Sequence, residues 1–545
     1  MPIMKNIAYL LSFTFLMIKM AAAQTLTSSN LPVVIIDTQG ETIKDEPKIV
    51  ADMKIIDNGA AKRNNLTDAP NGYNGKIGIE YRGSTSQMFP KKPYGFETRD
   101  AKNAGFEVPL LGMPKEEDWI LFASYNEKSL LNNAIAMKMA RDMGVYASRT
   151  KHVELVVNGR YEGIYVLMER IKRGSGRVNI SKMTDKDNAG DALTGGYIFK
   201  VDKTTGSGTG IGWNSKIPAP NNGRGQRIYY QYEYPKIDNI TAQQRAYLTA
   251  VVDSAEAVLN SSSYLDKTNG YRKYFDPATF AKLFLVNEVS KNVDGYRIST
   301  FFHKDKNSKD RRIKAGPAWD YDLAFGNADY YRGNETTGWS YLMNDSNDNW
   351  QVPFHWKKML EDPDFTADLS QQYTALRKGP WKTENLHAYV DSLAATLQEA
   401  QQRNFQRWPV LGVYIWPNPR PIATTWQGEI NELKDWLRAR LAWMDYSLPG
   451  TITSVEQPQN TISDLSVVIA PNPFADVARL RIRSPKPAQA LLEVTDLTGR
   501  AVGNKFVDLT EGLNEVSVSV GPLAGVYLLR VHTAQGVISQ KLVKQ

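Results

Sequence analysis

A break in composition near residue 450 divides this chain of 545 residues into two regions. Between Pro449 and Asp464 the sequence is rich in Thr, Ser, Gln, Asn and Pro and poor in apolar residues, which predicts a linker over residues 451–464. A long region precedes this linker, and a short one, residues 465–545, follows it. The chain contains no cysteine, so disulfides and thiolate metal sites are excluded. Each region must therefore be stabilised by an apolar core of its own.

The N-terminus has the pattern of a cleaved signal peptide. Lys5 precedes an apolar run around residues 7–18, and three alanines stand before Gln24. The run is too short to span a bilayer, and no later segment is apolar enough to do so. We therefore expect residues 1–23 to be removed and the mature protein, from residue 24, to be exported and soluble, with no transmembrane segment.

The charge pattern argues against a nucleic-acid partner. The formal net charge is +8, but basic and acidic residues are interspersed along the chain. Nucleic-acid binding would favour Lys and Arg gathered in a stripe or on one face. We expect no nucleic acid among the ligands.

The C-terminal region, residues 465–545, reads as a series of short strands. Apolar and polar residues alternate over residues 478–482 and 526–531, and pairs of turn-forming residues separate such segments. This pattern predicts a small Ig-like β-sandwich.

Three aspartates in residues 287–325 are the strongest candidates for chemistry. Asp294 follows a helix that Asp276 would cap and that begins at Pro277. A β-branched and aromatic strand over residues 298–302 comes next, then a polar hairpin and a returning segment that ends at Asp320 and Asp322. The paired strands would bring these three acids together.

Acidic residues that stand between large aromatic residues require a partner for their charge. Trp319, Tyr321 and Phe325 flank Asp320 and Asp322, and an unpaired charge in such surroundings is costly. Carboxylates are hard oxygen ligands, so a Mg²⁺ ion would supply the compensation. In the alternative interpretation Asp294 caps a turn and the other two acids bond local amides.

A polar turn at residues 82–86, RGSTS, lies between two predicted strands and would cradle a phosphate group. Its amides and hydroxyls stand beside three cations, Arg82, Lys91 and Lys92. The turn is not a Walker motif. Its alternative interpretation is a solvated hairpin with ordinary surface lysines.

The remaining order of elements predicts an α+β fold. A helix over residues 129–143 is followed by strands over 153–158 and 161–168, which an Asn-Gly turn joins. The region beyond Tyr341 is mostly helical and rich in tryptophan. These tryptophans would pack between helices, or alternatively would form a platform for carbohydrate.

Two family resemblances rest on ordered motifs. The long region resembles the CotH kinase family of spore-coat proteins over roughly residues 30–450. The C-terminal region resembles the sorting domain of the type IX secretion system of Bacteroidota. The motifs for the first are RGSTS (82–86), FPKKPY (89–94), DW (118–119), NGRYEGIYVLME (158–169), NVDGYR (292–297) and WDYD (319–322), and those for the second are APNPF (470–474), DLTGR (496–500) and GVYLLRV (525–531).

The first resemblance implies an atypical protein-kinase-like, two-lobed domain over residues 24–450 that uses ATP and Mg²⁺. Asp294 would then be the catalytic aspartate, and Asp320 or Asp322 the metal ligand. The cations of the 82–94 segment, Arg82, Lys91 and Lys92, would sit near the triphosphate. Met168, Glu169 and Arg170 would follow the last strand of the N-terminal lobe, at the place where adenine is gripped.

The resemblances imply an exported kinase, with one departure from the kinase pattern. Ser299 stands where protein kinases place an asparagine metal ligand, five residues after the catalytic aspartate. We therefore expect an atypical kinase that transfers the ATP γ-phosphate to a secreted or surface protein and reaches the surface through the periplasm and the type IX machinery. The alternatives are a catalytically silent surface, adhesion or binding module, and a metal-dependent hydrolase using Asp294 with Asp320.

Overall fold

The computed structural model describes residues 26–205, 211–221, 223–345, 347–448, 465–496, 501–520, 524–533 and 536–545. The chain divides into two compact units, which we call the N-terminal unit (Met1–Thr451) and the C-terminal unit (Ile452–Gln545). The expected signal peptide and linker lie outside the described residues. No helix in the described ranges has the length and apolar character needed to cross a membrane.

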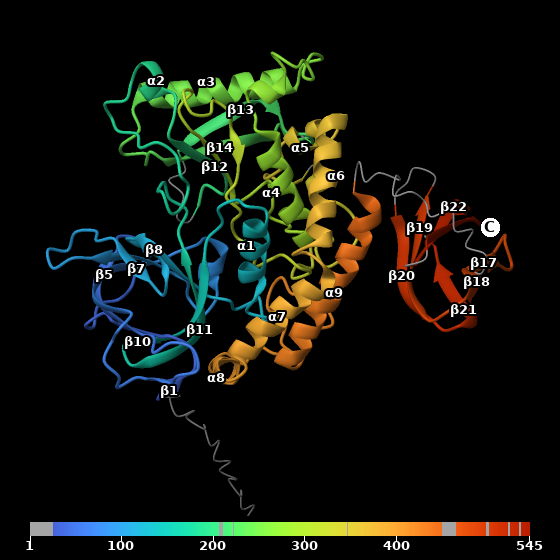
Figure 1. Cartoon of the computed structure of the whole chain (residues 1–545), viewed down its shortest axis with the longest axis horizontal. Helices are drawn as coiled ribbons and strands as arrows, with labels where there is room; N and C mark the ends of the chain where they lie inside the picture. The colour runs from blue at the N-terminus through green and yellow to red at the C-terminus, as the bar shows by residue number, and fades with distance from the viewer. Residues whose placement is uncertain are drawn as a thin grey trace, which may run out of the picture. The chain divides into compact units, whose positions relative to one another are not determined.

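The N-terminal unit begins with a closed β-barrel (Figure 1). Neighbouring strands are antiparallel except for β2 and β10, whose parallel pairing closes the barrel. Alternating apolar side chains fill it, including Met53, Ile79, Trp119 and Leu167, each fully buried. In spatial order the strands are β10 (Thr150–Val157), β11 (Arg160–Glu169), β9 (Asp118–Phe122), β6 (Tyr94–Arg99), β5 (Tyr73–Tyr81), β3 (Ile49–Ile56) and β2 (Val33–Asp37).

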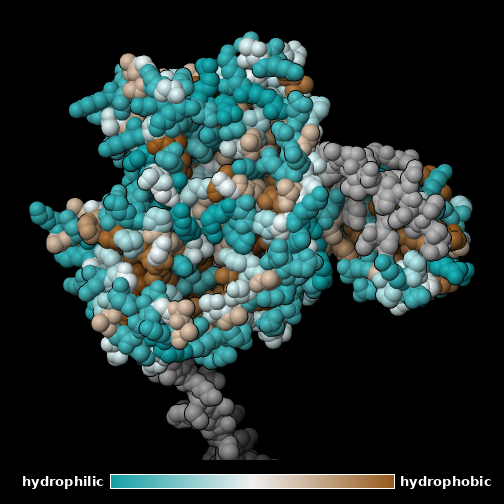
Figure 2. All heavy atoms as spheres, viewed as in Figure 1, coloured by the Kyte–Doolittle hydropathy of each residue, from teal (hydrophilic) through white to brown (hydrophobic). Residues whose placement is uncertain are grey.

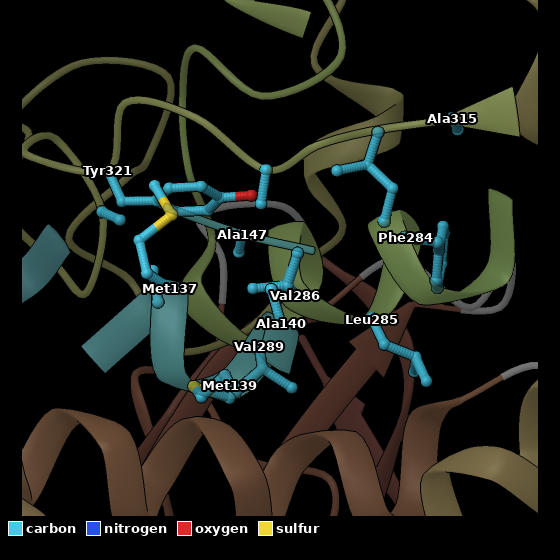
Figure 3. Packing of buried hydrophobic residues seen from close by; sticks show 14 of the residues in the cluster. Met137, Met139, Ala140, Ala147, Phe284, Leu285, Val286, Val289, Ala315 and Tyr321 are labelled. Atoms are coloured by element: carbon cyan, nitrogen blue, oxygen red, sulfur yellow. The ribbon is translucent and has the colours of Figure 1, made fainter. Parts of the chain in front are cut away.

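The helix α1 (Asn132–Asp142) connects β9 to β10 and packs against α4 (Pro277–Ser290). Figure 3 shows Met137, Met139 and Ala140 of α1 facing Val286 and Val289 of α4 in one buried cluster. The helix α4 begins as expected, with Asp276 at the N-cap and a proline at its first position, although the Asp276 side chain makes no capping hydrogen bond. It ends at Lys291 in a left-handed conformation.

A second, five-stranded sheet follows the barrel in sequence, with three strands before α4 and two after it, and carries two loops of the site. Its order is β13 (Gly212–Pro218), β14 (Arg227–Tyr234), β12 (Tyr197–Val201), β15 (Thr300–Lys304) and β16 (Lys314–Ala315). The expected return of the chain from β15 to β16 is confirmed, because Phe302 pairs with Ala315 in an antiparallel ladder. The helix α3 (Ala242–Leu259) lies against this sheet and starts with a capping box made by Thr241 and Gln244.

Helices make up most of the rest of the N-terminal unit. Trp356 of α5 and Trp381, which lies between α6 and α7, are fully buried in the shared core and agree with packing between helices, whereas Trp416 is 43% exposed. On the face that Figure 2 shows, hydrophilic residues cover most of this unit. The helices are α5 (His355–Met359), α6 (Pro363–Lys378), α7 (Thr383–Leu397), α8 (Ala400–Arg407) and α9 (Trp426–Ser447), and the short elements are β1 (Ser28–Ser29), β4 (Asn64–Asn65), β7 (Val108–Leu110), β8 (Met113–Glu116) and α2 (Gly190–Leu193).

The C-terminal unit is made of two antiparallel sheets that share one apolar core. The strict alternation of β18 buries Ala478, Leu480 and Ile482 and exposes the residues between them. These buried residues pack with Leu492 of β19 and Leu529 of β22, which belong to the other sheet. One sheet has the order β17 (Ser466–Ile469), β18 (Val477–Ser484), β21 (Gly512–Ser519), and the other β20 (Ala501–Leu509), β19 (Ala488–Asp496), β22 (Gly525–Thr533), β23 (Gly536–Lys544).

Candidate functional site

A polar pocket of about 140 Å³ lies within the N-terminal unit, where loops from the barrel, the five-stranded sheet and the segment after α4 meet. It brings together four carboxylates, which we call the acid group: Asp202, Asp294, Asp320 and Asp322. Two cationic side chains, Arg82 and Lys203, lie on the same lining. The structure thus places four of the seven predicted site residues, Arg82, Asp294, Asp320 and Asp322, in one pocket.

Asp294 lies on the turn that follows α4. Its amide donates a hydrogen bond to Oδ1 of Asn292 (3.2 Å), and the Asn292 side chain donates to the carbonyl of Asp320 (2.9 Å). Asn292 thereby ties the two acidic segments to each other. The Asp294 carboxylate has one weak ion pair, 3.7 Å from the guanidinium of Arg297, and its side chain is 15% exposed. It is therefore held in position while remaining accessible from the pocket.

The segment that carries Asp320 and Asp322 is anchored by α1. Oδ1 of Asn133 accepts a hydrogen bond from the Tyr321 amide (2.9 Å), and the Asn132 side chain donates to the carbonyl of Asp322 (3.3 Å). Asp320 itself adopts a left-handed backbone conformation with φ of 63°. Such a conformation is unfavourable for a residue other than glycine and is typical of functional sites.

The acid group is short of positive charge. Burial, followed by the charges of Asp294 and Asp202, raises the pKa of Asp320 to about 6. Burial and then the charge of Asp320 raise the pKa of Asp322 well above its ordinary value. Arg82 and Lys203 oppose these effects at Asp320 but do not cancel them. A bound cation would remove this penalty.

Asp202 belongs to the pocket but was not predicted from the sequence as a site residue. It directly follows β12, and Lys200 holds it at 3.4 Å while also pairing with Glu233 at 3.2 Å. The Ser299 amide donates a hydrogen bond to Oδ1 of Asp202 (3.3 Å). The Ser299 hydroxyl stands 3.5 Å from Asp202 and 3.5 Å from Asp320. The sequence signal that could have identified Asp202 is its position directly after an apolar strand.

The polar turn after β5 forms the cationic wall of the pocket. The guanidinium of Arg82 lies over the ring of Trp319, 5.6 Å from its centre, and burial lowers the pKa of Arg82 to about 10. Gly83 has φ of +90°, and a Cβ there would lie 2.1 Å from the Ser86 hydroxyl, so the turn requires glycine. Lys203 donates to the Thr85 hydroxyl at 3.2 Å, which joins this turn to the end of β12.

Three of the predicted binding residues do not line this pocket. Lys91 is buried, and its ammonium donates to the carbonyls of Ser124 and Ile164 and to the side chain of Asn404. Lys92 donates to the carbonyl of Gln87. Nearness in sequence to the turn suggested that both lysines would face the phosphates. They lie just before β6, which begins at Tyr94, and their ammonium groups bond to protein carbonyls instead.

Glu169 is the third predicted residue outside the pocket. Its side chain is fully buried at the end of β11 and pairs with Arg149 at 2.8 Å. It also accepts a hydrogen bond from the Arg149 amide (2.9 Å). The preceding residue, Met168, does reach a small cavity of about 60 Å³ beside Arg82, together with Ile120 and Phe122.

A second acidic cluster lies at the start of β9. Glu116, Glu117 and Asp118 form the one group in the described ranges whose three potential ligand atoms all lie within 4.8 Å of one another. Lys172 lies among them, with its ammonium 2.9, 3.1 and 2.7 Å from their respective carboxylates. We call this set the Lys172 cluster. Because a lysine already supplies the positive charge, a metal is not needed there.

The fold and this pocket define an α+β protein with an acid-lined site beside a β-barrel. Residues 79–444 match the family model described as CotH kinase protein, and the chain therefore belongs to that family. Residues 468–545 match the model described as a secretion system C-terminal sorting domain, which indicates export to the cell surface or the medium. No curated protein matched the chain.

Proposed function

We propose that this protein is an exported atypical kinase that transfers the γ-phosphate of ATP to a secreted or surface protein. The observation that carries the proposal is the meeting of Asp202, Asp294, Asp320 and Asp322 with Arg82 in one pocket. Phosphoryl transfer needs little covalent help from a protein, but it needs positioning and neutralisation of charge. Paired acids opposite a cationic turn meet both needs.

Asp294 is the residue that would accept the proton of the substrate hydroxyl. Its carboxylate is partly exposed and its backbone is fixed by Asn292. A general base must reach the proton it removes, and a position on a turn at the pocket lining favours this. Arg297, at 3.7 Å, would help to hold the carboxylate in place.

The acid group also fits a divalent cation. Mg²⁺ is commonly held by one or two carboxylates together with substrate phosphates, and when bound it neutralises the developing phosphate charge. Asp320 and Asp322 are the residues whose raised pKa values report uncompensated charge. Asp202 offers a further carboxylate next to Ser299, the residue that stands where the kinase pattern has asparagine and whose hydroxyl lies 3.5 Å from both Asp202 and Asp320.

Arg82 and Lys203 would contact the phosphates, and the cavity lined by Ile120, Phe122 and Met168 would take the apolar base. Along the chain, a strand-rich part with one helix is followed by a largely helical part. This order supports the two-lobed arrangement that the family resemblance implies. Lys91, Lys92 and Glu169 are left out of this proposal because their side chains bond elsewhere.

Export completes the proposal. A leader over residues 1–23 would direct the chain to the periplasm, and the sorting domain would engage the type IX machinery for passage to the surface. The match of residues 468–545 to a secretion system sorting domain supports the second step. Deleting Leu465–Gln545 should leave a folded protein in the periplasm, and its appearance at the surface would contradict this route.

The direct test incubates the purified protein with ATP labelled in the γ-phosphate, Mg²⁺ and the exported proteins of its host. We expect labelled Ser, Thr or Tyr on an exported protein, with no label when Mg²⁺ is chelated. ATP binding without any transfer would replace the kinase by the catalytically silent binding module. Neither binding nor transfer would reject both the ATP site and the kinase.

A further inference from the structure

A second cavity, of about 280 Å³, lies between the end of α1, the first half of α4 and the segment that leads to Asp320. Its walls are largely apolar and include Met143 of α1, Leu283 and Val286 of α4, and Ala318. Figure 3 shows Ala140, Val286 and Ala315, three of the residues that line this cavity. The cavity is separate in its lining from the pocket that holds the acid group.

A buried guanidinium on the lining lacks part of its hydrogen bonding. Arg177 is 4% exposed, and its Nη1 donates to the carbonyls of Asp118 and Arg170, both at 2.8 Å. Its Nε and Nη2 donate to no acceptor within the described part of the chain. Buried donors are almost always satisfied, so these two N–H groups call for an acceptor.

The charge of Arg177 is only partly compensated. The nearest carboxylate, Glu169, stands 3.9 Å from Nε, which is beyond hydrogen-bond length. That same carboxylate already pairs with Arg149 at 2.8 Å. One negative charge therefore faces two guanidinium groups, and a net positive charge remains beside the cavity.

A second cation adds to this excess. Lys282 of α4 lines the cavity and has no ion pair or hydrogen bond from its side chain within the described residues. Lys314, also on the lining, is paired with Asp310 at 3.1 Å. The imidazole of His303 is neutral at pH 7, because burial lowers its pKa to about 4. The lining contains no aspartate or glutamate.

We propose that this cavity binds a small amphiphilic anion, a molecule with one acidic head and a short apolar body. The head would accept hydrogen bonds from Arg177 and pair with Lys282, while the body would contact Met143, Leu283 and Val286. Charge-assisted hydrogen bonds to a guanidinium are strong and favour carboxylate or phosphate heads. The proposal does not depend on phosphate transfer in the other pocket.

Ordered water is the competing occupant. A polar cavity of this size holds water, and water would satisfy the free N–H groups equally well. It would not, however, confer a preference for an apolar chain. Binding that needs both a negative head and an apolar body therefore separates the two interpretations.

The experiment measures the melting temperature of the full chain with octanoate, octyl phosphate, octanol, octyltrimethylammonium or acetate, all below micelle-forming concentrations. A ligand that binds the folded state raises this temperature. We expect saturable increases with octanoate or octyl phosphate, whichever head fits better, and none with the other three. Equal shifts with octanol or acetate, or no shift with either anion, would overturn the proposal.

Variants locate the binding. Lys282→Met removes the charge, keeps an unbranched stem on a half-buried helical position, and should weaken octanoate binding at least tenfold by calorimetry. The matched control is Lys357→Met, an exposed lysine on α5, which should bind octanoate like the parent. Arg177→Lys should weaken binding further if it folds. Parental affinity in Lys282→Met would contradict the assignment of this cavity.

Discussion

Two groups of acids in the N-terminal unit differ in what neutralises them. In the Lys172 cluster, burial alone would raise the pKa of Asp118, but Arg170, Lys172 and Lys48 outweigh burial and lower it. In the acid group, burial and neighbouring carboxylates raise the pKa of Asp320 to about 6. The closer packing of carboxylates is found in the Lys172 cluster, which is the one that contains its own cation.

Crowding of acidic side chains therefore does not by itself identify a metal site. A lysine among carboxylates makes a structural ion network, whose members lower each other's cost of burial. Carboxylates whose pKa values stay raised by burial and by neighbouring negative charge mark the place where an external cation would bind.

The largest expected effect is on stability, with opposite signs at the two groups. Asp118→Asn should destabilise the protein by about 3 kcal/mol, because it removes the buried carboxylate that pairs with Lys172 and Lys48. Asp320→Asn should stabilise the magnesium-free protein by relieving burial and repulsion. Urea unfolding would measure both, with Asp435→Asn as the exposed control. A loss of stability at Asp320 similar to that at Asp118 would remove the distinction.

Within the acid group, Asp294 should affect chemistry more than binding. Asp294→Asn should reduce phosphate transfer by a factor of about 10² or more, as expected for losing a general base, while MgATP still raises the melting temperature. Asp320→Asn should instead abolish the Mg²⁺ dependence of that rise. Transfer rates and thermal shifts measured on the same preparations would check this division. Parental transfer in both variants would refute the assigned roles.

A smaller effect should distinguish the cations near the polar turn. Arg82→Gln should weaken ATP binding by about 1.5–3 kcal/mol, the range for a lost charge-assisted hydrogen bond. Lys92→Gln should leave ATP affinity unchanged, since its ammonium bonds the Gln87 carbonyl outside the pocket. Calorimetric titration of both variants with MgATP gives the comparison. An equal loss of ATP affinity in the two variants would show that Lys92 also contacts the nucleotide.

The smallest effect is a difference in pH dependence. A carboxyl whose pKa is higher when folded stabilises the protein below its unfolded pKa, about 4, and this stability is lost as the pH rises through its folded pKa. For Asp320 that folded value is about 6. The melting temperature of Asp320→Asn should therefore exceed that of the magnesium-free parent increasingly from pH 4 to pH 6.

Asp118 should behave in the opposite way. Because its pKa is lowered on folding, its contribution is present above the ordinary carboxyl pKa and is lost as the pH falls. The deficit of Asp118→Asn relative to the parent should thus shrink in acid. Thermal melts of both variants across this pH range would check the two slopes, and slopes of the same sign would contradict the comparison.

Local signals in the sequence predicted much of the fold. The Asn-Gly pair at residues 158–159 predicted the hairpin of β10 and β11, and Asp276 with Pro277 predicted the start of α4. Alternation predicted β18. These features depend on neighbours in the chain, so one sequence is enough to find them.

Contacts between distant segments were harder to predict. The strand β13 lies in a stretch rich in Gly, Ser, Asn and Pro that carries no strand pattern, yet it pairs with β14 at the edge of the sheet. Asp202 enters the pocket because β12 pairs with β15, which aligns Val201 with Thr300. The ammonium of Lys91 bonds to Asn404, more than three hundred residues away. Sequence spacing carries no information about such pairings.

The central claim is that the acid group, and not the Lys172 cluster, binds the metal–nucleotide pair. Its most direct test is the thermal shift produced by MgATP compared with Mg²⁺ alone, measured on the parent, on Asp320→Asn and on Glu117→Gln. We predict a rise for the parent and for Glu117→Gln, and loss of its Mg²⁺ dependence for Asp320→Asn, since a nucleotide that binds the folded state must raise the midpoint. No MgATP shift in the parent, or a shift that Glu117→Gln abolishes and Asp320→Asn preserves, would contradict the account.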